Sequence, residues 1–313
     1  MFRERGRFGR LLVTVFAVVL AGCRSKEAPK AAPKMEKKGP ALPTGTLLYT
    51  TQGGLWKLTR GASPERVLEH GTYWFPAINA DVNQGACWVD LGGEMALEIV
   101  NLVSHVTVRA GQWGTLGALG RNLNLRNAPV WIPGRDVVVF ADGRQIWQVD
   151  ADGGNLQTIY EHPDGGCYSV TLSPDGDRLA FVGVTDKEQN LWSYSLKTKR
   201  ATPITDYTNQ MGAVGAPAWS PKGDRIIFVL YKGEEANLYT VPAEGGTPNK
   251  LTKEGRTNAP AWDPTGRKLA VSSGTQNPLV WQIALVDPDT CKFLEQLTTA
   301  PAGAFAPSIE GAW

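Results

Sequence analysis

Residues 216–252 read APAWSPKGDRIIFVLYKGEEANLYTVPAEGGTPNKLT. The stretch contains four short apolar runs, separated by turns rich in Gly, Pro and Glu. Ile, Val, Phe, Tyr and Trp fill the runs, and this composition predicts four antiparallel strands. Because a four-stranded sheet cannot bury both of its faces alone, the unit predicts further copies that stack on it.

The first strand and turn of this unit recur along the chain. The copies are FPAINADV (75–82), APVWIPGR (128–135), SVTLSPDG (169–176), APAWSPKG (216–223), APAWDPTG (259–266) and APSIEGAW (306–313). Successive copies start 53, 41, 47, 43 and 47 residues apart. A period in the forties, built of four strands, is typical of a β-propeller.

The two ends of the repeat region share one blade in this interpretation. Residues 46–70 supply a second, third and fourth strand without a first, and residues 306–313 supply a first strand. One C-terminal strand joined to three N-terminal strands closes the ring and removes its exposed edges. The sequence therefore predicts an all-β fold, a six-bladed β-propeller over residues 45–313.

The repeat resembles that of TolB-type propellers, also described as PD40 or WD40-like repeats. The resemblance rests on APAWSPKGDRIIF (216–228), the strand that starts Asn-Leu-Tyr at 237, the Gly-Gly turn at 245–246 and Leu-Thr at 251–252. It covers about residues 45–313 and implies the propeller architecture. TolB itself carries an α/β domain before its propeller, and related peptidases carry a hydrolase domain with a Gly-x-Ser-x-Gly motif. Neither feature is found in this sequence, which predicts a free-standing propeller.

Residues 1–22 have the pattern of an export signal. Four Arg residues up to Arg10 precede the apolar run Leu11–Leu20, which is too short to span a bilayer. Leu20-Ala21-Gly22-Cys23 then resembles the bacterial lipobox, and this resemblance implies cleavage before Cys23 and lipidation of its thiol. Because Arg24 follows the Cys in place of Asp, the outer membrane is the favoured address.

Residues 23–44 are predicted to be the lipidated Cys and a tether rich in Lys, Pro and Ala. They carry almost no large apolar side chains and cannot form a core. The formal charge is +3 for residues 1–23 and +4 for residues 24–44, so the rest of the +2 chain carries −5. A mildly acidic folded region argues against nucleic acid as its partner.

Sequence motifs for catalysis or metal binding are not found. The chain has no His-Glu-x-x-His, P-loop, Gly-x-Gly-x-x-Gly or Cys-x-x-Cys. The three His residues, His70, His105 and His162, are expected on the surface at the blade rims. Three Cys residues besides Cys23 fall in three different blades and are expected to be free thiols, buried or partly buried. They are Cys87, Cys167 and Cys291. We expect no catalytic residue, no metal and no cofactor.

Most Trp residues are explained by the repeat. Trp131, Trp219 and Trp262 share one first-strand position, and four more lie in third strands at Trp56, Trp147, Trp192 and Trp281. Aromatic residues repeated in this way are expected to pack blade against blade. Trp74 and Trp113 break the pattern and remain candidates for ligand or partner contact.

One face of the propeller carries the variable loops. The connections between blades share this face with the loops between second and third strands, and it includes the long insertion 111–127. Because binding functions concentrate on variable loops of rigid scaffolds, we expect a partner there. The candidate contact residues are Tyr73, Trp74, Trp113, Arg121, Arg126 and Asn127. The alternative is that the insertion plugs the channel mouth.

Two functional classes follow from the sequence. The first is a membrane-anchored cell-envelope lipoprotein whose propeller is a non-catalytic scaffold for an envelope protein or a peptidoglycan-associated partner. The second is a periplasmic propeller hydrolase or lyase of the lactonase kind. Such an enzyme needs several carboxylate or amide ligands on its first strands, and Asn127 and Asn258 are the only repeated polar residues there.

Overall fold

The computed structural model describes the chain from residue 46 to residue 309, with gaps. The described residues are 46–51, 54–59, 62–69, 72–79, 81, 83–90, 95–113, 128–208, 211–253, 255–274, 281–297 and 308–309. The signal peptide, Cys23 and the tether predicted from the sequence lie outside these residues. Within the described part of the chain, no helix is long and apolar enough to cross a membrane.

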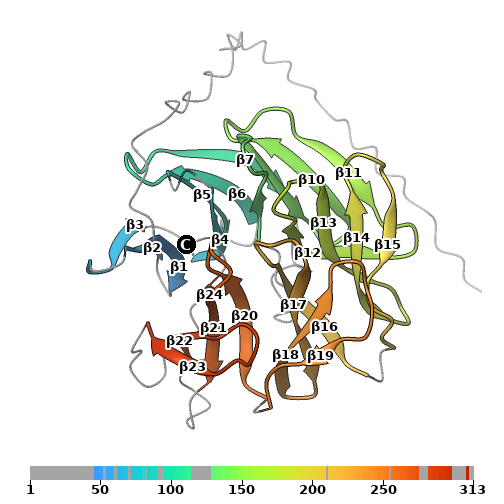
Figure 1. The fold of residues 1–313 in the computed structure, drawn as a ribbon. Coiled ribbons are helices and arrows are strands. Elements are labelled where there is room, and N and C mark those ends of the chain that lie inside the picture. The colour runs from blue at the N-terminus through green and yellow to red at the C-terminus, as the bar shows by residue number, and fades with distance from the viewer. Residues whose placement is uncertain are drawn as a thin grey trace, which may run out of the picture. The chain divides into compact units, whose positions relative to one another are not determined.

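The described strands form six four-stranded antiparallel sheets, which confirms the predicted propeller (Figure 1). Blade 1 contains β24 (Ser308–Ile309), β1 (Thr46–Thr51), β2 (Gly54–Thr59) and β3 (Glu65–Leu68). Blade 2 contains β4 (Thr72–Ile78), β5 (Gln84–Asp90), β6 (Met95–Asn101) and β7 (Thr107–Trp113). Blade 3 contains β8 (Val130–Trp131), β9 (Val137–Ala141), β10 (Gln145–Asp150) and β11 (Gln157–Glu161).

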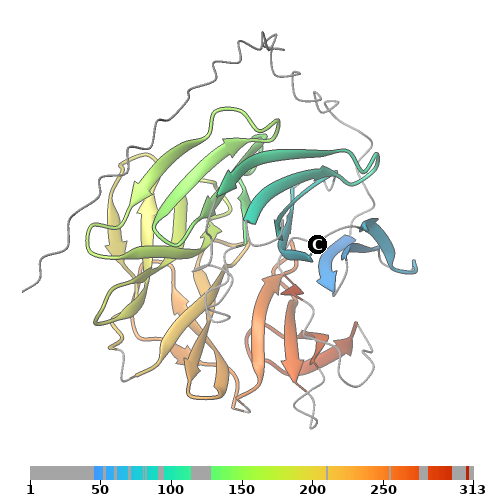
Figure 2. The ribbon, with the colours of Figure 1, turned by 180° about the vertical axis from the view of Figure 1, so that it is seen from behind.

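The other three blades repeat the same order, and Figure 2 shows the sheets from behind. Blade 4 contains β12 (Gly166–Leu172), β13 (Arg178–Val184), β14 (Gln189–Ser195) and β15 (Ala201–Pro203). Blade 5 contains β16 (Ala213–Trp219), β17 (Arg225–Lys232), β18 (Glu235–Pro242) and β19 (Asn249–Lys250). Blade 6 contains β20 (Thr257–Trp262), β21 (Leu269–Gly274), β22 (Trp281–Val286) and β23 (Phe293–Gln296).

Blade 1 is closed as the sequence predicts. The C-terminal strand β24 pairs with β1, with Tyr49 opposite Ile309, and the red and blue ends of the chain meet in this sheet (Figure 1). β24 also contacts β20 of blade 6 and β4 of blade 2. The first strand of blade 1 is therefore supplied from the far end of the chain, and the ring has no open edge there.

Apolar cores lie between neighbouring blades. The buried apolar residues that the structure describes fall into six clusters, one for each pair of adjacent blades. The second strand β17 shows how this arises, because its side chains alternate between two clusters. Ile226 and Phe228 face blade 4, whereas Ile227 and Val229 face blade 6. Both faces of a second strand are buried, so these strands read as continuous apolar runs.

The first strands contain a bulge that the sequence analysis did not predict. Their pairing with second strands shifts register between Gly215 and Ala218, and at the equivalent place in blades 2, 4 and 6. Within the bulge, Ala216 and Ala259 adopt positive φ of 45° and 50°. This left-handed conformation is strained for a residue with a Cβ, and its repetition marks the bulge as a feature of the fold.

Candidate functional site

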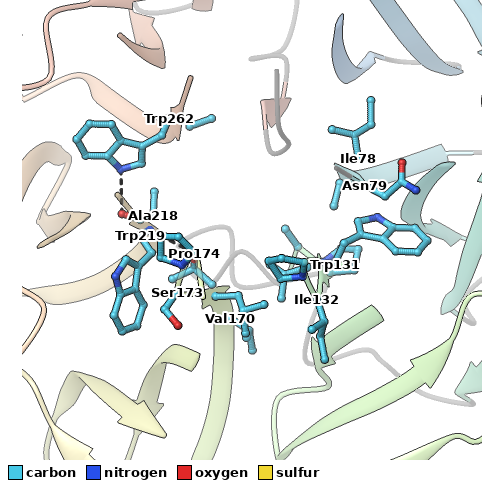
Figure 3. A pocket seen from close by; sticks show the side chains of 18 of the residues that line it. Ile78, Asn79, Trp131, Ile132, Val170, Ser173, Pro174, Ala218, Trp219 and Trp262 are labelled. Carbon is cyan, nitrogen blue, oxygen red and sulfur yellow. Dashed lines mark hydrogen bonds between the residues drawn. The ribbon is translucent and has the colours of Figure 1, made fainter. Parts of the chain in front are cut away.

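A central cavity of about 770 Å³ is enclosed by the first strands (Figure 3). Its lining comes from blades 2 to 6 and extends from the first-strand bulges to the turns between first and second strands. Most lining residues are Ala, Pro, Val, Ile and Trp. We call the end that carries these turns the turn face, and the opposite end, with the connections between blades, the loop face.

The rim of the cavity on the turn face is a ring of stacked turns. Each turn contributes a proline to the lining: Pro133, Pro174, Pro221 and Pro264. In blades 4, 5 and 6 the glycine of the turn packs on the proline of the preceding blade. A Cβ at Gly176 would lie 3.4 Å from Cδ of Pro133, and a Cβ at Gly223 would lie 3.6 Å from Cδ of Pro174. Both glycines have positive φ, so their turns depend on glycine, and the mouth of the cavity is preformed.

The tryptophans of the first strands stand between blades, as predicted. Trp131, Trp219 and Trp262 are each at most 9% exposed, and each belongs to a different inter-blade core. Trp262 donates its Nε1 hydrogen to the Ala218 carbonyl at 3.1 Å, across the boundary between blades 5 and 6 (Figure 3). The side chain of Trp281 lies outside the described residues.

Two of these tryptophans are covered by an arginine from the preceding blade. The guanidinium carbon of Arg178 lies 5.1 Å from the ring centroid of Trp219. That of Arg225 lies 5.2 Å from the centroid of Trp262. Each arginine also pairs at 2.6 Å with an acid on the next blade's outer turn: Arg178 with Glu244, and Arg225 with Asp289. The Gly-Asp-Arg sequence of the repeat therefore clamps one blade to the next.

Polar side chains at the first-to-second-strand turns of blades 2, 4, 5 and 6 form hydrogen bonds within those turns. Ser173 Oγ donates to Asp175 Oδ1 at 2.5 Å and accepts the N–H of Arg178. This hydroxyl is the main reason that the pKa of Asp175 is lowered. In blade 2 the carboxamide oxygen of Asn79 accepts the backbone N–H groups of Asn83 and residue 84. The acidic turn residues are thus hairpin chemistry, as the sequence indicates.

Asn258, one of the two repeated polar residues, is also satisfied within the fold. Its Oδ1 accepts hydrogen bonds from the Tyr231 hydroxyl at 2.7 Å and from the N–H of Ala259 at 2.8 Å. Asn127 lies outside the described residues. Over the ranges that the structure describes, no three His, Cys, Asp or Glu residues gather as a metal site would require.

The sequence predicts a partner-binding surface on the loop face. The structure contradicts this role for one of its residues, Tyr73. Tyr73 is 6% exposed and packs in the core between blades 1 and 2. Burial, followed by the nearby Glu98, raises its pKa to about 12. The tyrosine points inward because strand residues alternate between the two faces of the sheet. We therefore remove Tyr73 from the partner face.

The other residues of that face are not placed by the structure. The backbones of Trp74 and Trp113 lie in β4 and β7, but their side chains fall outside the described residues. Arg121, Arg126 and Asn127 also lie outside them. Sequence reasoning did not identify the cavity at the turn face, although the repeated Ala-Pro first strands and Pro-Gly turns were the pattern that builds it.

The histidine prediction is corrected at one position, and the cysteine prediction is confirmed. His162 is only 5% exposed, because it is covered by blade 4 where the chain leaves blade 3, whereas His105 is on the surface. His70 lies outside the described residues. Cys87, Cys167 and Cys291 are free thiols, the first two buried and the third half-buried. Burial is the first cause of the raised pKa of all three thiols, which reaches about 12 at Cys167 and about 11 at Cys291.

Solved structures of several different proteins have this fold. TolB from Acinetobacter baumannii is 17% identical to this chain, with a TM-score of 0.69 over 85% of this chain and 67% of TolB. A nidogen/laminin complex contains a chain that is 10% identical, with a TM-score of 0.64 over 85% of this chain and 97% of the other. An oligogalacturonate lyase in complex with manganese is 16% identical, with a TM-score of 0.53 over 81% of this chain and 74% of the lyase. These identities show a shared fold alone.

Sequence comparison identifies the family. No curated protein matches the chain. The model of the family described as "TolB beta propeller domain", PD40, matches residues 137–293, which is half of the chain. The matched region spans most of blade 3 and blades 4 to 6, where the Arg–Trp clamps and stacked turns repeat most regularly. The chain therefore belongs to the TolB beta propeller domain family.

Proposed function

We propose that this protein is a membrane-anchored cell-envelope lipoprotein whose propeller binds another protein without catalysing a reaction. The observation that carries the binding role is the preformed cavity. Its volume lies within the range of known ligand pockets, and its walls offer Ala, Pro, Val and Trp surface. In blades 2 and 4 the polar side chains at these turns are already hydrogen-bonded within the turns. Such a surface suits apolar side chains of a protein or peptide better than it suits acid–base chemistry.

The anchor remains a proposal from the sequence. Cys23 follows the lipobox-like Leu20-Ala21-Gly22, and the basic tether continues to residue 44. Two or three acyl chains would hold the protein durably on a membrane, at about 0.8 kcal/mol for each buried CH₂. We propose the outer membrane, with the propeller facing the periplasm.

The anchor has a direct test. Cells that express the wild-type chain or Cys23→Ser are labelled with radioactive palmitate and fractionated. The wild-type protein should carry the label and sediment with membranes, and the variant should do neither. Label retained by Cys23→Ser would show that lipid is attached elsewhere.

Two surfaces are candidates for the partner-binding site. The loop face is the prediction from the sequence, with Trp74, Trp113, Arg121, Arg126 and Asn127 as its residues. The cavity at the turn face is the surface that the structure adds. A partner that crosslinks to the wild-type chain in the native envelope should be lost on substitution of one face and retained on substitution of the other.

The test uses one variant for each face. Trp113→Ala with Arg126→Ala changes the loop face. Pro217→Arg places a long charged side chain on a half-buried cavity position, and Pro242→Arg is its matched control on an exposed strand end. Loss of the crosslinked partner only with Pro217→Arg assigns the cavity, and loss only with the loop-face pair assigns the loop face. Retention in every variant contradicts both assignments.

The alternative function is a metal-dependent hydrolase or lyase. It is favoured by the fold shared with an oligogalacturonate lyase that holds manganese. The described lining residues do not fit such a site, because Asp81 and Asp136 are its carboxylates and both are exposed on the rim. Metal analysis of the purified protein, together with an oligogalacturonate cleavage assay, distinguishes the two functions. A stoichiometric divalent metal with cleavage activity would overturn the non-catalytic proposal.

A further inference from the structure

The chain leaves blades 4 and 5 through connections that are held by buried asparagines. In each case the carboxamide oxygen of an asparagine near the start of the third strand accepts two hydrogen bonds from the connection. Asn190 accepts from the Thr205 hydroxyl at 2.9 Å and the Tyr207 N–H at 2.6 Å, and Asn237 accepts from the Thr252 hydroxyl at 3.2 Å and the Gly255 N–H at 3.1 Å. None of these groups titrates near neutral pH, so both locks are insensitive to protons.

The connection from blade 3 to blade 4 is held differently. Gln145 takes the asparagine's place at the start of the third strand, and its side chain accepts the exposed Thr158 hydroxyl and not the connection. The connection is secured by His162, which is 5% exposed. Its ring packs edge to face on Trp192, with centroids 5.1 Å apart, and its backbone hydrogen-bonds the Cys167 thiol.

The hydrogen bonds of His162 require a neutral ring. Nδ1 accepts the backbone N–H of Asp164 at 3.3 Å, so the ring proton resides on Nε2. Nε2 is buried and has no hydrogen-bond partner among the described residues. A second proton on Nδ1 would face the Asp164 N–H, donor against donor, and would place a charge on a ring that is only 5% exposed. Gly183 packs against the rings of Trp192 and His162 and has no side chain that could form a hydrogen bond with the charged imidazole.

The surroundings of His162 have opposite effects on its pKa. Burial disfavours the charged ring, whereas the carboxylates of Asp164 on the connection and Glu188 on the loop before β14 favour it. Burial is the largest effect, and the pKa of His162 is lowered. Cys167 on β12 stays neutral, since burial raises its pKa to about 12.

We propose that His162 is a proton-sensitive latch on the loop face, in which protonation releases the blade 3 to blade 4 connection while the asparagine locks of blades 4 and 5 hold. The stabilisation from neutral His162 is complete above the unfolded pKa of about 6.5 and is lost as the pH falls below it. The opening is local, since the inter-blade core beneath contains Phe181 and Tyr194, which do not titrate in this range.

The first test measures the latch in the full chain. The imidazole signal of His162 is assigned by its absence from the spectrum of His162→Gln and is titrated by NMR. Its pKa should lie below 6.5. Hydrogen exchange, corrected for intrinsic rates, should rise at residues 160–168 between pH 7.5 and pH 5.5, while residues 205–208 change little. A His162 pKa at or above 6.5 overturns the proposal.

The second test removes the titrating group. His162→Phe keeps a ring against Trp192, and His162→Gln serves if the phenylalanine variant fails to fold. The wild-type urea midpoint should fall between pH 7.5 and pH 5.5 by more than the midpoint of either variant falls. His105→Gln, at an exposed histidine on the turn face, is the matched control and should keep the wild-type fall. An equal fall in wild type and in the folded His162 variants overturns the proposal.

Discussion

The inter-blade clamp at Arg225 allows a stability prediction worked from the structure. The guanidinium lies 5.2 Å from the centroid of Trp262, and Nη2 lies 2.6 Å from Asp289 Oδ1. The arginine side chain is 25% exposed and that of Asp289 is 67% exposed. Replacement by methionine keeps an apolar stem over the tryptophan and removes the charge and the ion pair.

Three contributions set the magnitude. A mostly buried cation over a Trp ring contributes about 1–2 kcal/mol. The ion pair contributes about 0–1 kcal/mol, since Asp289 is largely in water. Arg225 Nε is buried without a hydrogen-bond partner among the described residues. Its removal therefore offsets the lost stabilisation by on the order of 1 kcal/mol. The three contributions together give about 0–2 kcal/mol, so we expect Arg225→Met to lower the free energy of unfolding by about 1 kcal/mol, which corresponds to about 2–4 °C in Tm.

The assay is urea and thermal unfolding of wild type, Arg225→Met, Asp289→Asn and the double variant. The coupling between Arg225 and Asp289 should be about 0.2–1 kcal/mol and should shrink in 1 M salt, whereas the contact with Trp262 should persist. Arg178→Met, at the equivalent clamp between blades 4 and 5, should have a similar effect. Arg135→Met, on an exposed turn, is the control and should stay within about 0.5 kcal/mol of wild type. A change at Arg225 no larger than the change at Arg135 would refute the clamp.

Three further predictions follow from other contacts. Asn190→Ala should cost about 2–3 kcal/mol, because it strands the backbone N–H of Tyr207, and hydrogen exchange should rise at that connection; unchanged exchange would contradict the lock. Gly183→Ala should cost about 1–3 kcal/mol in thermal unfolding, because the new Cβ would lie 2.6 Å from Cδ1 of Trp192; an unchanged Tm would mean that the ring can move aside freely. Cys87 should resist a thiol reagent at pH 8 until urea unfolds the protein, since burial raises its pKa; rapid native modification would disprove that burial.

The sequence predicted the blades because the information is local. Pro and Gly mark each turn, and continuous apolar runs mark strands buried on both faces, as in Ile226–Val229. Five complete repeats and the two partial blades at the ends also predicted closure by β24, which the pairing with β1 confirms. The packing of the first-strand tryptophans between blades was also predictable, because a residue that recurs at the same position of each repeat usually contacts the neighbouring copy.

The features that the sequence left open depend on contacts between repeats. His162 resembles a rim residue in the sequence, yet Trp192 of the next blade covers it. Tyr73 stands beside Trp74 in a first strand, but strand alternation directs it into the core between blades 1 and 2.

The sequence by itself determined the blade count, the strand order and the closing strand, because these follow from turn chemistry and period. Only the tertiary structure decided where the cavity lies and which side chains remain available. The cavity is lined by five blades, and its shape depends on the first-strand bulges and on turn contacts such as that of Gly176 with Pro133. The clamp of Arg225 on Trp262 joins residues of different blades. Whether a side chain is buried depends on the neighbouring blade, so burial cannot be read from the sequence of one repeat.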